Sequence, residues 1–419
     1  MTEINKTALV LAGGGLTGAV YEIGALRAIN DLLIDRTVND FDIFVGTSAG
    51  ALVGAFLANG ITPEEMMRSI AGSHPDLLPI QRRHIFNIKR SELLRTGMEL
   101  PVKVGRAWWR YFREREATLF DVAWALLDVL PAGFYDGMAL ERYVREMLEH
   151  RGLCNCFTAT PKELFVVATE LDSGERAVFS RETTPEVPIS AAVAASSAVP
   201  VVYKPVRIQG HEYVDGGLRG NASLDIAIEA GASLIVCVNP MVPFDNSDHR
   251  SIPADIIGKR YGKHYLSESG LNYIANQVTR ILTHASIRYH VKQLRRSHPE
   301  VDIILIEPNP EDHAMFFYNP MRYSARLEVA RYGFESATLG LAEDYPYYKA
   351  TLARHGIPMT RRLVIQELQA LREAEDSEAR YRVLSRILGA RRSIAEGGNP
   401  VRQLQRTLAQ LELLLEGSS

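Results

Sequence analysis

The stretches LVLAGGGLTG at residues 9–18 and IFVGTSAG at residues 43–50 share one pattern. In each, a short apolar strand runs into a glycine turn and then into a helical segment. Ser48 stands at the apex of the second turn. A strand-turn-helix elbow of this kind holds a serine side chain clear of the backbone, and flanking glycines let its two arms approach without Cβ clashes. The pattern therefore predicts a serine acyl hydrolase.

The surroundings of Ser48 add information, because a bare Gly-x-Ser-x-Gly arises by chance in roughly one in seven chains of this length. The apolar run 41–45 leads directly into the turn. The segment 49–58 leads out of it and is rich in alanine and glycine, as in a helix that packs close to a sheet. Asn59-Gly60 is a typical end for such a helix.

The first glycine loop has two interpretations. Its G-x-G-x-x-G spacing at residues 13–18 fits a dinucleotide fingerprint, which needs an acidic residue at the end of the second strand. Here Asp40 and Asp42 lie at the start of that strand, and its far end carries the serine turn. The exposed N–H groups of residues 14–16 can instead stabilise an oxyanion, the charge that develops in acyl transfer. We favour the oxyanion interpretation, since the two loops are neighbours in a parallel sheet.

The group that activates Ser48 is not a histidine in any recognisable motif. A Ser-His-Asp hydrolase places its nucleophile after several β-α-β units of about 30 residues each, so Ser48 comes too early. The eleven histidines are scattered. Asp215, in the segment YVDGG at residues 213–217, can take the serine proton directly if burial raises its pKa. Taken alone, Asp-Gly is also a hairpin-turn signal.

Four motifs occur in a characteristic order. They are the glycine loop 13–18, the elbow 46–50, the stretch VAASSAVP at residues 193–200, and Asp-Gly-Gly at 215–217. In this combination the chain resembles the patatin-like phospholipase family, as a bacterial-type member. The similarity covers about residues 6–240 and continues more weakly through 301–306 and 321–334.

The resemblance implies a Ser-Asp dyad that hydrolyses acyl esters of lipids, as a phospholipase A, lysophospholipase or esterase. It implies no metal and no other cofactor. The implied site residues are Ser48 and Asp215 as the catalytic pair, Gly13, Gly14, Gly15 and Leu16 as the oxyanion hole, Gly46, Thr47, Ala49 and Gly50 as the nucleophile elbow, and Gly216 and Gly217 as the dyad loop.

Two positions depart from the family pattern. The family often has a basic residue where this chain has Thr17, and a proline within the segment that here reads NASL at residues 221–224. The first departure removes a cation near the anion-binding loop, which puts a strong preference for one phospholipid head group in doubt. It leaves the backbone donors of the loop untouched.

Composition is consistent with a large α/β enzyme. The chain has 419 residues, 46% of them hydrophobic and 23% charged, enough to bury a sizeable core. A formal net charge of −3 argues against bulk nucleic-acid binding. We expect the three cysteines to be reduced thiols, since their count is odd and their spacing is not that of a zinc site. No signal peptide or membrane span is recognisable, so we expect a cytoplasmic protein that reaches membranes from the surface.

Further strands are expected at residues 164–169, 177–179, 213–214, 234–238 and 301–306. Helical stretches separate most of them, which favours a mainly parallel sheet with helices on both faces. The expected fold is a three-layer α/β/α patatin-like fold with a helical insertion and C-terminal helices. Thr62-Pro63-Glu64-Glu65 reads as a capping box that opens a helix.

The domain organisation follows from these patterns. We expect a catalytic domain over residues 1–340, with a helical cap or insertion at about 75–135, and a helical extension over 341–419. Tryptophans and arginines within residues 103–130 suit peripheral contact with a lipid surface, or an ordinary amphipathic helix packed on the core. Amphipathic helices are expected at 361–388 and 404–415, where they dock on the core, pair in a homo-oligomer or touch a membrane.

Two alternatives to a lipid hydrolase stay open at this point. One is a catalytically silent lipid-binding or scaffold protein on the same fold, against which the intact Ser48 and Asp215 count. The other is a dinucleotide-binding oxidoreductase, which rests on the spacing of the first loop alone.

Overall fold

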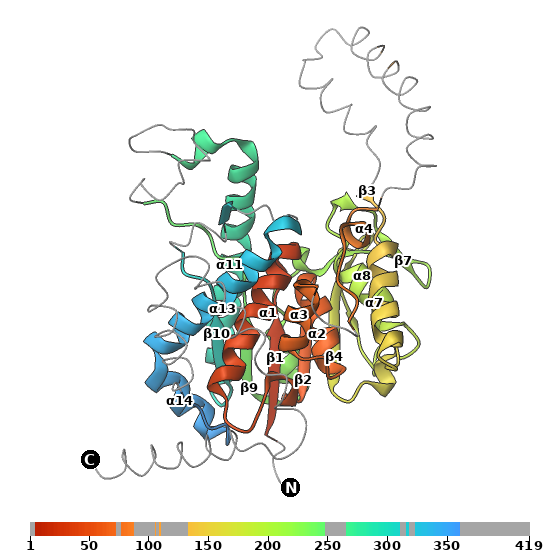
Figure 1. The fold of residues 1–419 in the computed structure, drawn as a ribbon. Helices are drawn as coiled ribbons and strands as arrows, with labels where there is room; N and C mark the ends of the chain where they lie inside the picture. The colour runs from red at the N-terminus through yellow and green to blue at the C-terminus, as the bar shows by residue number, and fades with distance from the viewer. Residues whose placement is uncertain are drawn as a thin grey trace, which may run out of the picture.

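The computed structural model describes residues 5–72, 77–87, 105, 109, 133–247, 265–310, 316–317 and 323–360. Within these ranges one sheet runs through the body and helices cover both of its faces (Figure 1). Its strands are β1 (Lys6–Leu11), β2 (Ile43–Thr47), β4 (Glu163–Glu170), β5 (Arg176–Phe179), β7 (Val206–Ile208), β8 (His211–Asp215), β9 (Ala232–Val238) and β10 (Asp302–Ile306). A separate two-stranded sheet pairs β3 (Gly133–Tyr135) with β6 (Val201–Tyr203).

The helices alternate with these strands along the chain. They are α1 (Gly15–Leu32), α2 (Ala49–Ala58), α3 (Pro63–Ile70), α4 (Arg82–Ile85), α7 (Met138–His150), α8 (Ile189–Ser196), α9 (Leu224–Glu229), α11 (Leu271–Ser297), α13 (Arg326–Glu343) and α14 (Tyr345–Arg354). Short 3-10 turns are η1 (Val38–Asp40), η2 (Phe157–Ala159), η3 (Gly216–Leu218), η4 (Leu266–Ser269) and η5 (Tyr323–Ala325).

The strand order is β10-β9-β1-β2-β4-β8-β7, with β5 also paired to β4. From β10 to β4 all neighbours are parallel. β5 and β8 run antiparallel to β4, and β7 runs antiparallel to β8. The mainly parallel sheet is confirmed, and each expected strand falls on one of these elements. The sequence did not reveal the reversal at β8, which matters for the site because β8 ends at Asp215.

The sheet is buried on both faces, as its continuous apolar strands predict. On one face Leu9 and Leu11 of β1 pack into a core with α1, α2 and α13. On the other face Ala8 and Val10 pack with α9 and α11. This is the expected three-layer arrangement, with β1 at its centre.

Helices α1 and α13 approach closely because glycines face each other's backbone. A Cβ on Gly24 would overlap the carbonyl oxygen of Ala330, and a Cβ on Gly333 would overlap the carbonyl oxygen of Tyr21. Gly24 and Gly333 therefore hold the two helices at a separation that no larger residue permits.

Two local sequence signals are confirmed. Gly60 has φ +84° just beyond the last turn of α2, as expected of a helix end. At the start of α3, Glu65 N–H donates to Thr62 Oγ1 and Thr62 N–H donates to Glu65, with Pro63 in the first helical position. The capping box thus starts the helix where the sequence predicts.

The described residues beyond 340 pack against the rest of the protein. Tyr345 begins α14, and its hydroxyl donates to the carbonyl of Met359. Thr360 N–H donates to the carbonyl of Leu32 at the end of α1. The helices expected at 361–388 and 404–415 lie outside the described residues, as does most of the insertion expected at 75–135, including nearly all of 103–130.

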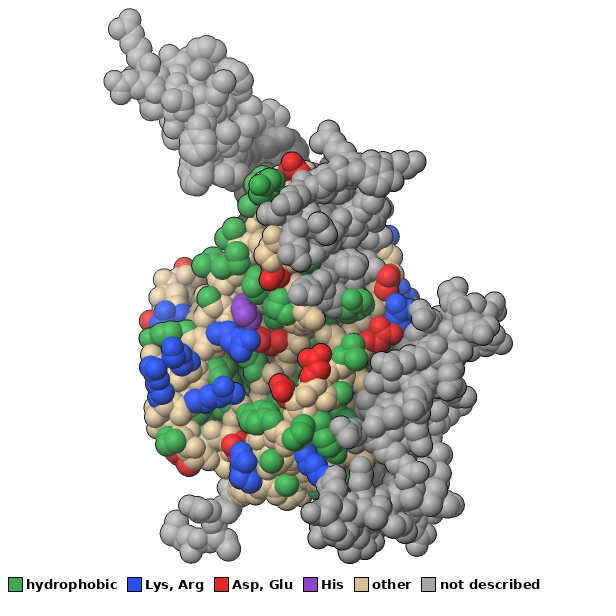
Figure 2. Space-filling model, turned by 90° about the vertical axis from the view of Figure 1, so that its left-hand side faces the viewer, with side chains coloured by type: hydrophobic (Ala, Val, Ile, Leu, Met, Phe, Trp, Pro, Cys, Tyr) green, Lys and Arg blue, Asp and Glu red, His purple; other side chains and the backbone are tan. Residues whose placement is uncertain are grey.

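None of the helices in the described ranges is both long enough and apolar enough to cross a bilayer. On the face shown in Figure 2, basic and acidic side chains are interspersed with hydrophobic ones. Both signs of charge on one face fit the small net charge of the chain.

The close approach of α1 and α13 predicts opposite effects for two Gly→Ala changes on α13. Gly333→Ala should lower the melting temperature, because overpacking typically costs about 1–3 kcal/mol. Gly340→Ala should leave it unchanged or raise it, since a Cβ there meets nothing within 4 Å and alanine favours helix over glycine by about 0.5–1 kcal/mol. Thermal unfolding of both variants measures this, and equal melting temperatures would contradict the packing.

Candidate active site

Ser48 occupies a strained turn between β2 and α2. Its backbone has φ +53° and ψ −117°, the left-handed region that a non-glycine residue rarely adopts. The turn is possible because Gly46 and Gly50 carry no Cβ: one on Gly50 would overlap the Leu11 carbonyl, and one on Gly46 would overlap backbone of Gly50 and Ala51. The structure thus has the elbow geometry expected from residues 46–50.

Asp215 lies beside Ser48 because of strand register. Thr47, the residue before the serine, pairs with Val167 of β4. Asp215 pairs with Ala168, the next residue of β4, along the same edge, since β5 occupies the opposite edge at both positions. The carboxyl ends of β2 and β8 therefore meet at adjacent positions of β4, which places Ser48 and Asp215 close together although they lie far apart in the sequence.

The environment of Asp215 suits a base. Burial raises the pKa of the Asp215 carboxyl to about 6, while the Ser48 hydroxyl and the Gly217 N–H lower it by smaller amounts. Gly217 N–H donates to Oδ1 at 2.7 Å. The other oxygen, Oδ2, is buried and has no hydrogen-bond partner among the described residues. One oxygen is thus held in place by the Gly217 amide, and the Ser48 hydroxyl is close enough to the carboxyl to lower its pKa.

The glycine loop borders the serine, as expected, but its amides are not equivalent. A Cβ on Gly13 would lie 3.1 Å from Ser48 Cβ, so the loop passes close to the serine side chain. Gly13 N–H already donates to the side chain of Asn221 at 3.0 Å. Within the described residues no such bond occupies the N–H groups of residues 14–16, which form the start of α1. These three N–H groups therefore have the free hydrogen-bonding capacity that an oxyanion hole requires.

Asn221 is a site residue whose role the sequence did not reveal. Its Oδ1 accepts from Gly13 N–H and its Nδ2 donates to the Gly13 carbonyl at 3.1 Å. The side-chain amide therefore pairs with the peptide groups of the glycine loop. Because Asn221 follows the Asp-Gly-Gly turn by a few residues, this pair ties the aspartate loop to the oxyanion loop.

Two serines of the 193–200 stretch hold the elbow. Ser48 N–H donates to Ser196 Oγ at 2.8 Å, and Ser196 Oγ in turn donates to the Val167 carbonyl of β4. Ser197 Oγ donates to the Ser48 carbonyl at 3.2 Å. The sequence pointed to this stretch only as part of a resemblance; the structure shows that it supports the strained turn.

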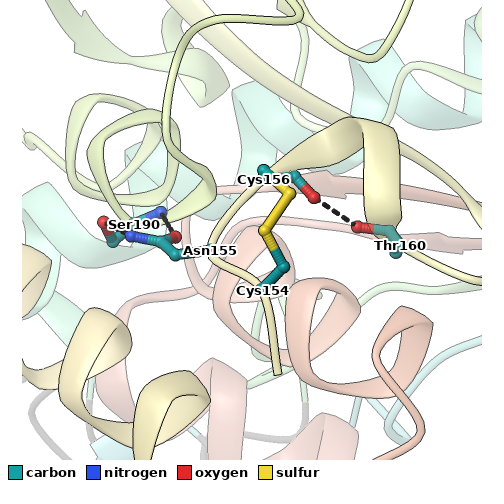
Figure 3. Close-up of a disulfide and its surroundings, with 5 residues drawn as sticks. All are labelled: Cys154, Asn155, Cys156, Thr160 and Ser190. Atoms are coloured by element: carbon teal, nitrogen blue, oxygen red, sulfur yellow. Dashed lines mark hydrogen bonds between the residues drawn. A yellow bond between two sulfur atoms is a disulfide. The ribbon is translucent and has the colours of Figure 1, made fainter. Parts of the chain in front are cut away.

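The start of α8 is anchored to a loop that contains a disulfide. Cys154 and Cys156 are joined, which corrects the expectation of reduced thiols; only Cys237 is free, and it is buried. Their Cα atoms lie 5.3 Å apart, within the range that a disulfide bridges. Asn155 between them points away from the sulfurs towards Ser190 and exchanges two hydrogen bonds with it (Figure 3).

The alternatives to this site lack support in the geometry. His211 lies at the far end of β8 from Asp215, and its Nδ1 is 2.6 Å from Glu170. Asp42 Oδ2 accepts from the N–H and hydroxyl of Thr7 at the amino end of the sheet, so it is not available to a ribose at the glycine loop. Among the residues that the structure describes, His211 and Asp42 are thus not placed where a triad histidine or a dinucleotide carboxylate would have to lie.

Comparison with known proteins agrees with this geometry. A family model described as "Patatin-like phospholipase" matches residues 9–228. "Probable lipid hydrolase 463L" of Invertebrate iridescent virus 6 is 25% identical over 221 residues, 53% of this chain and 63% of that protein. "Uncharacterized protein YqhO" of Bacillus subtilis is 24% identical over 222 residues, 51% of this chain and 63% of that protein. The chain thus covers less than two thirds of these relatives.

Among solved structures, VipD from Legionella pneumophila aligns over 81% of this chain and 67% of its own, with 16% identity and a TM-score of 0.35. The type III effector protein ExoU aligns over 93% of this chain and 71% of its own, with 13% identity and a TM-score of 0.28.

The raised pKa of Asp215 predicts that Asp215→Asn stabilises the protein. A carboxyl whose folded pKa lies above its unfolded value opposes folding when ionised, by about 1–3 kcal/mol for a shift of this size. The gain should be full at pH 7–8 and should shrink as the pH falls through 6 towards 4, where the carboxyl is neutral in both states. Denaturant unfolding of the variant measures it, with exposed Asp172→Asn as control; a gain that does not change with pH would contradict the assignment.

The same pKa predicts the pH dependence of turnover. A base must be ionised, so kcat/KM for a soluble ester should rise with pH around 6 and level off above 7. His211→Ala should show the wild-type profile, because His211 lies away from the pair. Loss of the profile in this variant would indicate a histidine base instead.

Proposed function

The chain belongs to the patatin-like phospholipase family, and from that premise we propose that it hydrolyses acyl ester bonds of lipids, with Ser48 as nucleophile and Asp215 as general base. The observation that carries the proposal is the pairing of a strained serine with a buried carboxylate that has one unoccupied oxygen. Stability alone gives no reason for either feature, since both oppose folding.

The proposed acylation step uses these groups in turn. As Ser48 Oγ attacks the carbonyl carbon, its proton passes to Asp215 Oδ2. The negative charge moves to the carbonyl oxygen, where the N–H groups of residues 14–16 hold it. When the tetrahedral intermediate collapses, the bond to the alcohol oxygen breaks and Asp215 returns its proton to that oxygen. The acyl group is then an ester of Ser48.

Deacylation repeats the sequence with water. Asp215 takes a proton from the attacking water, the same amides hold the second oxyanion, and the proton returns to Ser48 Oγ as the fatty acid leaves. The turn stays in place through both steps because Ser48 N–H donates to Ser196 and Ser197 donates to the Ser48 carbonyl, and the loop stays in place because Asn221 bonds to Gly13. Preorganised donors of this kind need no rearrangement as the charge develops.

Two single variants test the proposal. Ser48→Ala and Asp215→Asn should each lower kcat for p-nitrophenyl butyrate by about 10⁴-fold or more, and the double variant should be no worse, because the two residues act as one unit. Exposed Ser173→Ala is the control and should retain activity. Mass spectrometry of a mixed lipid extract should show free fatty acid with the wild type only.

Two results would exclude the proposal. A correctly folded Ser48→Ala variant with near-normal turnover would remove the nucleophile. Saturable lipid binding by the wild type without release of any fatty acid would favour a silent lipid-binding protein on the same fold.

A further inference from the structure

The loop between α7 and β4 carries a disulfide that solvent can reach. Cys154 and Cys156 are joined across a single intervening residue, and their Cα atoms lie 5.3 Å apart. Cys154 is exposed and Cys156 is half-buried. A disulfide is reduced when a thiolate reaches one of its sulfurs, and exposed disulfides are the more readily reduced ones. The Cys154 side of the bond is therefore open to thiols from solution.

Asn155, between the two cysteines, caps α8. The first N–H groups of a helix have no partner within it, and Pro188, which precedes α8, has no side chain that accepts from them. Asn155 supplies two acceptors, its carbonyl to Ile189 N–H at 3.4 Å and its Oδ1 to Ser190 N–H at 2.9 Å. Its Nδ2 also donates to Ser190 Oγ at 2.7 Å (Figure 3). A residue 35 positions earlier in the chain thus completes the start of α8.

The disulfide restricts the conformation of Asn155. The sulfurs of its two neighbours close a small ring that contains its backbone, so few backbone angles are open to it. Cys156 also forms an antiparallel bridge with Pro188, next to the cap. Once the S–S bond is broken, Asn155 regains the freedom of an ordinary loop residue, and its hydrogen bonds must be formed against that conformational entropy. Reduction therefore weakens the cap.

The other end of α8 holds the serine turn. α8 has 8 residues, and so short a helix depends on its surroundings for stability. Ser196, its last residue, accepts from Ser48 N–H, and Ser197 donates to the Ser48 carbonyl. The cap at the first turn and the contacts with Ser48 thus lie at the two ends of one short helix. A change at the disulfide loop reaches the serine turn through α8.

The third cysteine of the chain takes no part in this arrangement. Cys237 lies in β9 and is fully buried, and burial raises the pKa of its thiol above the usual value. A buried thiol that stays protonated neither attacks a disulfide nor reacts with reagents in solution. An effect of small thiols on the folded protein is therefore assigned to Cys154 and Cys156.

We propose that the Cys154–Cys156 disulfide is a site of thiol–disulfide exchange with small thiols, and that its reduction loosens α8 and the serine turn. A thiolate attacks Sγ of Cys154, the S–S bond breaks, and Cys156 leaves as a thiolate that takes up a proton. A second thiol then attacks the mixed disulfide and releases the Cys154 thiol. The protein disulfide is reduced to a dithiol, and two small thiols are oxidised to one disulfide.

Thiol counting tests the exchange itself. Alkylation with iodoacetamide in denaturant, followed by mass spectrometry, should find one thiol after treatment with oxidised glutathione. It should find three after treatment of the folded protein with dithiothreitol. Three thiols after both treatments would mean that the disulfide does not form, and one after both would mean that the folded protein shields it. Either result would overturn the proposal.

Hydrogen–deuterium exchange tests the coupling to Ser48. Reduction of the wild type should speed amide exchange in α8 and in residues 46–50 by about 2- to 30-fold, the effect of losing one helix cap. Exchange in β10, which lies at the far edge of the sheet, should not change. Unchanged exchange in α8 or in residues 46–50, or an equal acceleration in β10, would contradict the inference.

Variants separate the disulfide from the cap. The double variant Cys154→Ser, Cys156→Ser should exchange like the reduced wild type and should not respond to dithiothreitol. Asn155→Ala keeps the disulfide and removes the side-chain acceptor, so α8 should exchange faster in both redox states. Exposed Thr158→Ala, in the same loop, is the control. A response to dithiothreitol in the folded double variant, or wild-type exchange in Asn155→Ala, would refute the coupling; if the double variant does not fold, the two redox states of the wild type decide it.

Turnover gives a further readout that is independent of exchange. After dithiothreitol is removed, reduced protein should hydrolyse p-nitrophenyl butyrate about twofold or more slowly, and oxidised glutathione should restore the rate. An unchanged rate would overturn the link to Ser48. Thiol counting and amide exchange need no turnover. If neither redox state hydrolyses any ester, the proposed function fails, and those two measurements still decide this inference.

Discussion

The edge of β4 that β2 and β8 share is the constraint on which the site depends. Ser48 follows β2 where that strand stops pairing with β4, and Asp215 ends the antiparallel β8 at the next position along the same edge. Both residues oppose folding, since the serine has a positive φ and the carboxyl is buried with one oxygen that has no hydrogen-bond partner among the described residues. The two are stable together only because the surrounding strands and helices hold them.

That support comes from distant parts of the chain. Ser196 bonds both the Ser48 N–H and the Val167 carbonyl, so α8 fastens the elbow to β4. Asn221 exchanges two hydrogen bonds with Gly13, which links the loop after Asp215 to the glycine loop. The serine turn, the loop after Asp215 and the glycine loop are therefore each hydrogen-bonded to distant parts of the chain rather than standing as three independent loops.

Features that depend on neighbouring residues could be predicted from the sequence, whereas contacts between residues far apart in the chain could not. The elbow at Ser48, the capping box at Thr62 and the main strands follow from short-range chemistry, and the structure has all of them. Asp215 was predicted as the base from the order of motifs, because a lone Asp-Gly also fits a hairpin, and this role stays a prediction. The roles of Ser196 and Asn221 depend on pairings across 148 and 208 residues, which no local pattern reveals. The Cys154–Cys156 disulfide was missed because the odd cysteine count favoured free thiols.

The most direct test of the Ser48–Asp215 pair is covalent labelling by an alkyl organophosphonate, followed by peptide mapping with mass spectrometry. The account predicts one adduct, on Ser48, and much slower labelling of Asp215→Asn at pH 8, where the wild-type carboxyl is ionised. An adduct on another residue, or equal labelling rates in the wild type and a folded Asp215→Asn variant, would contradict it.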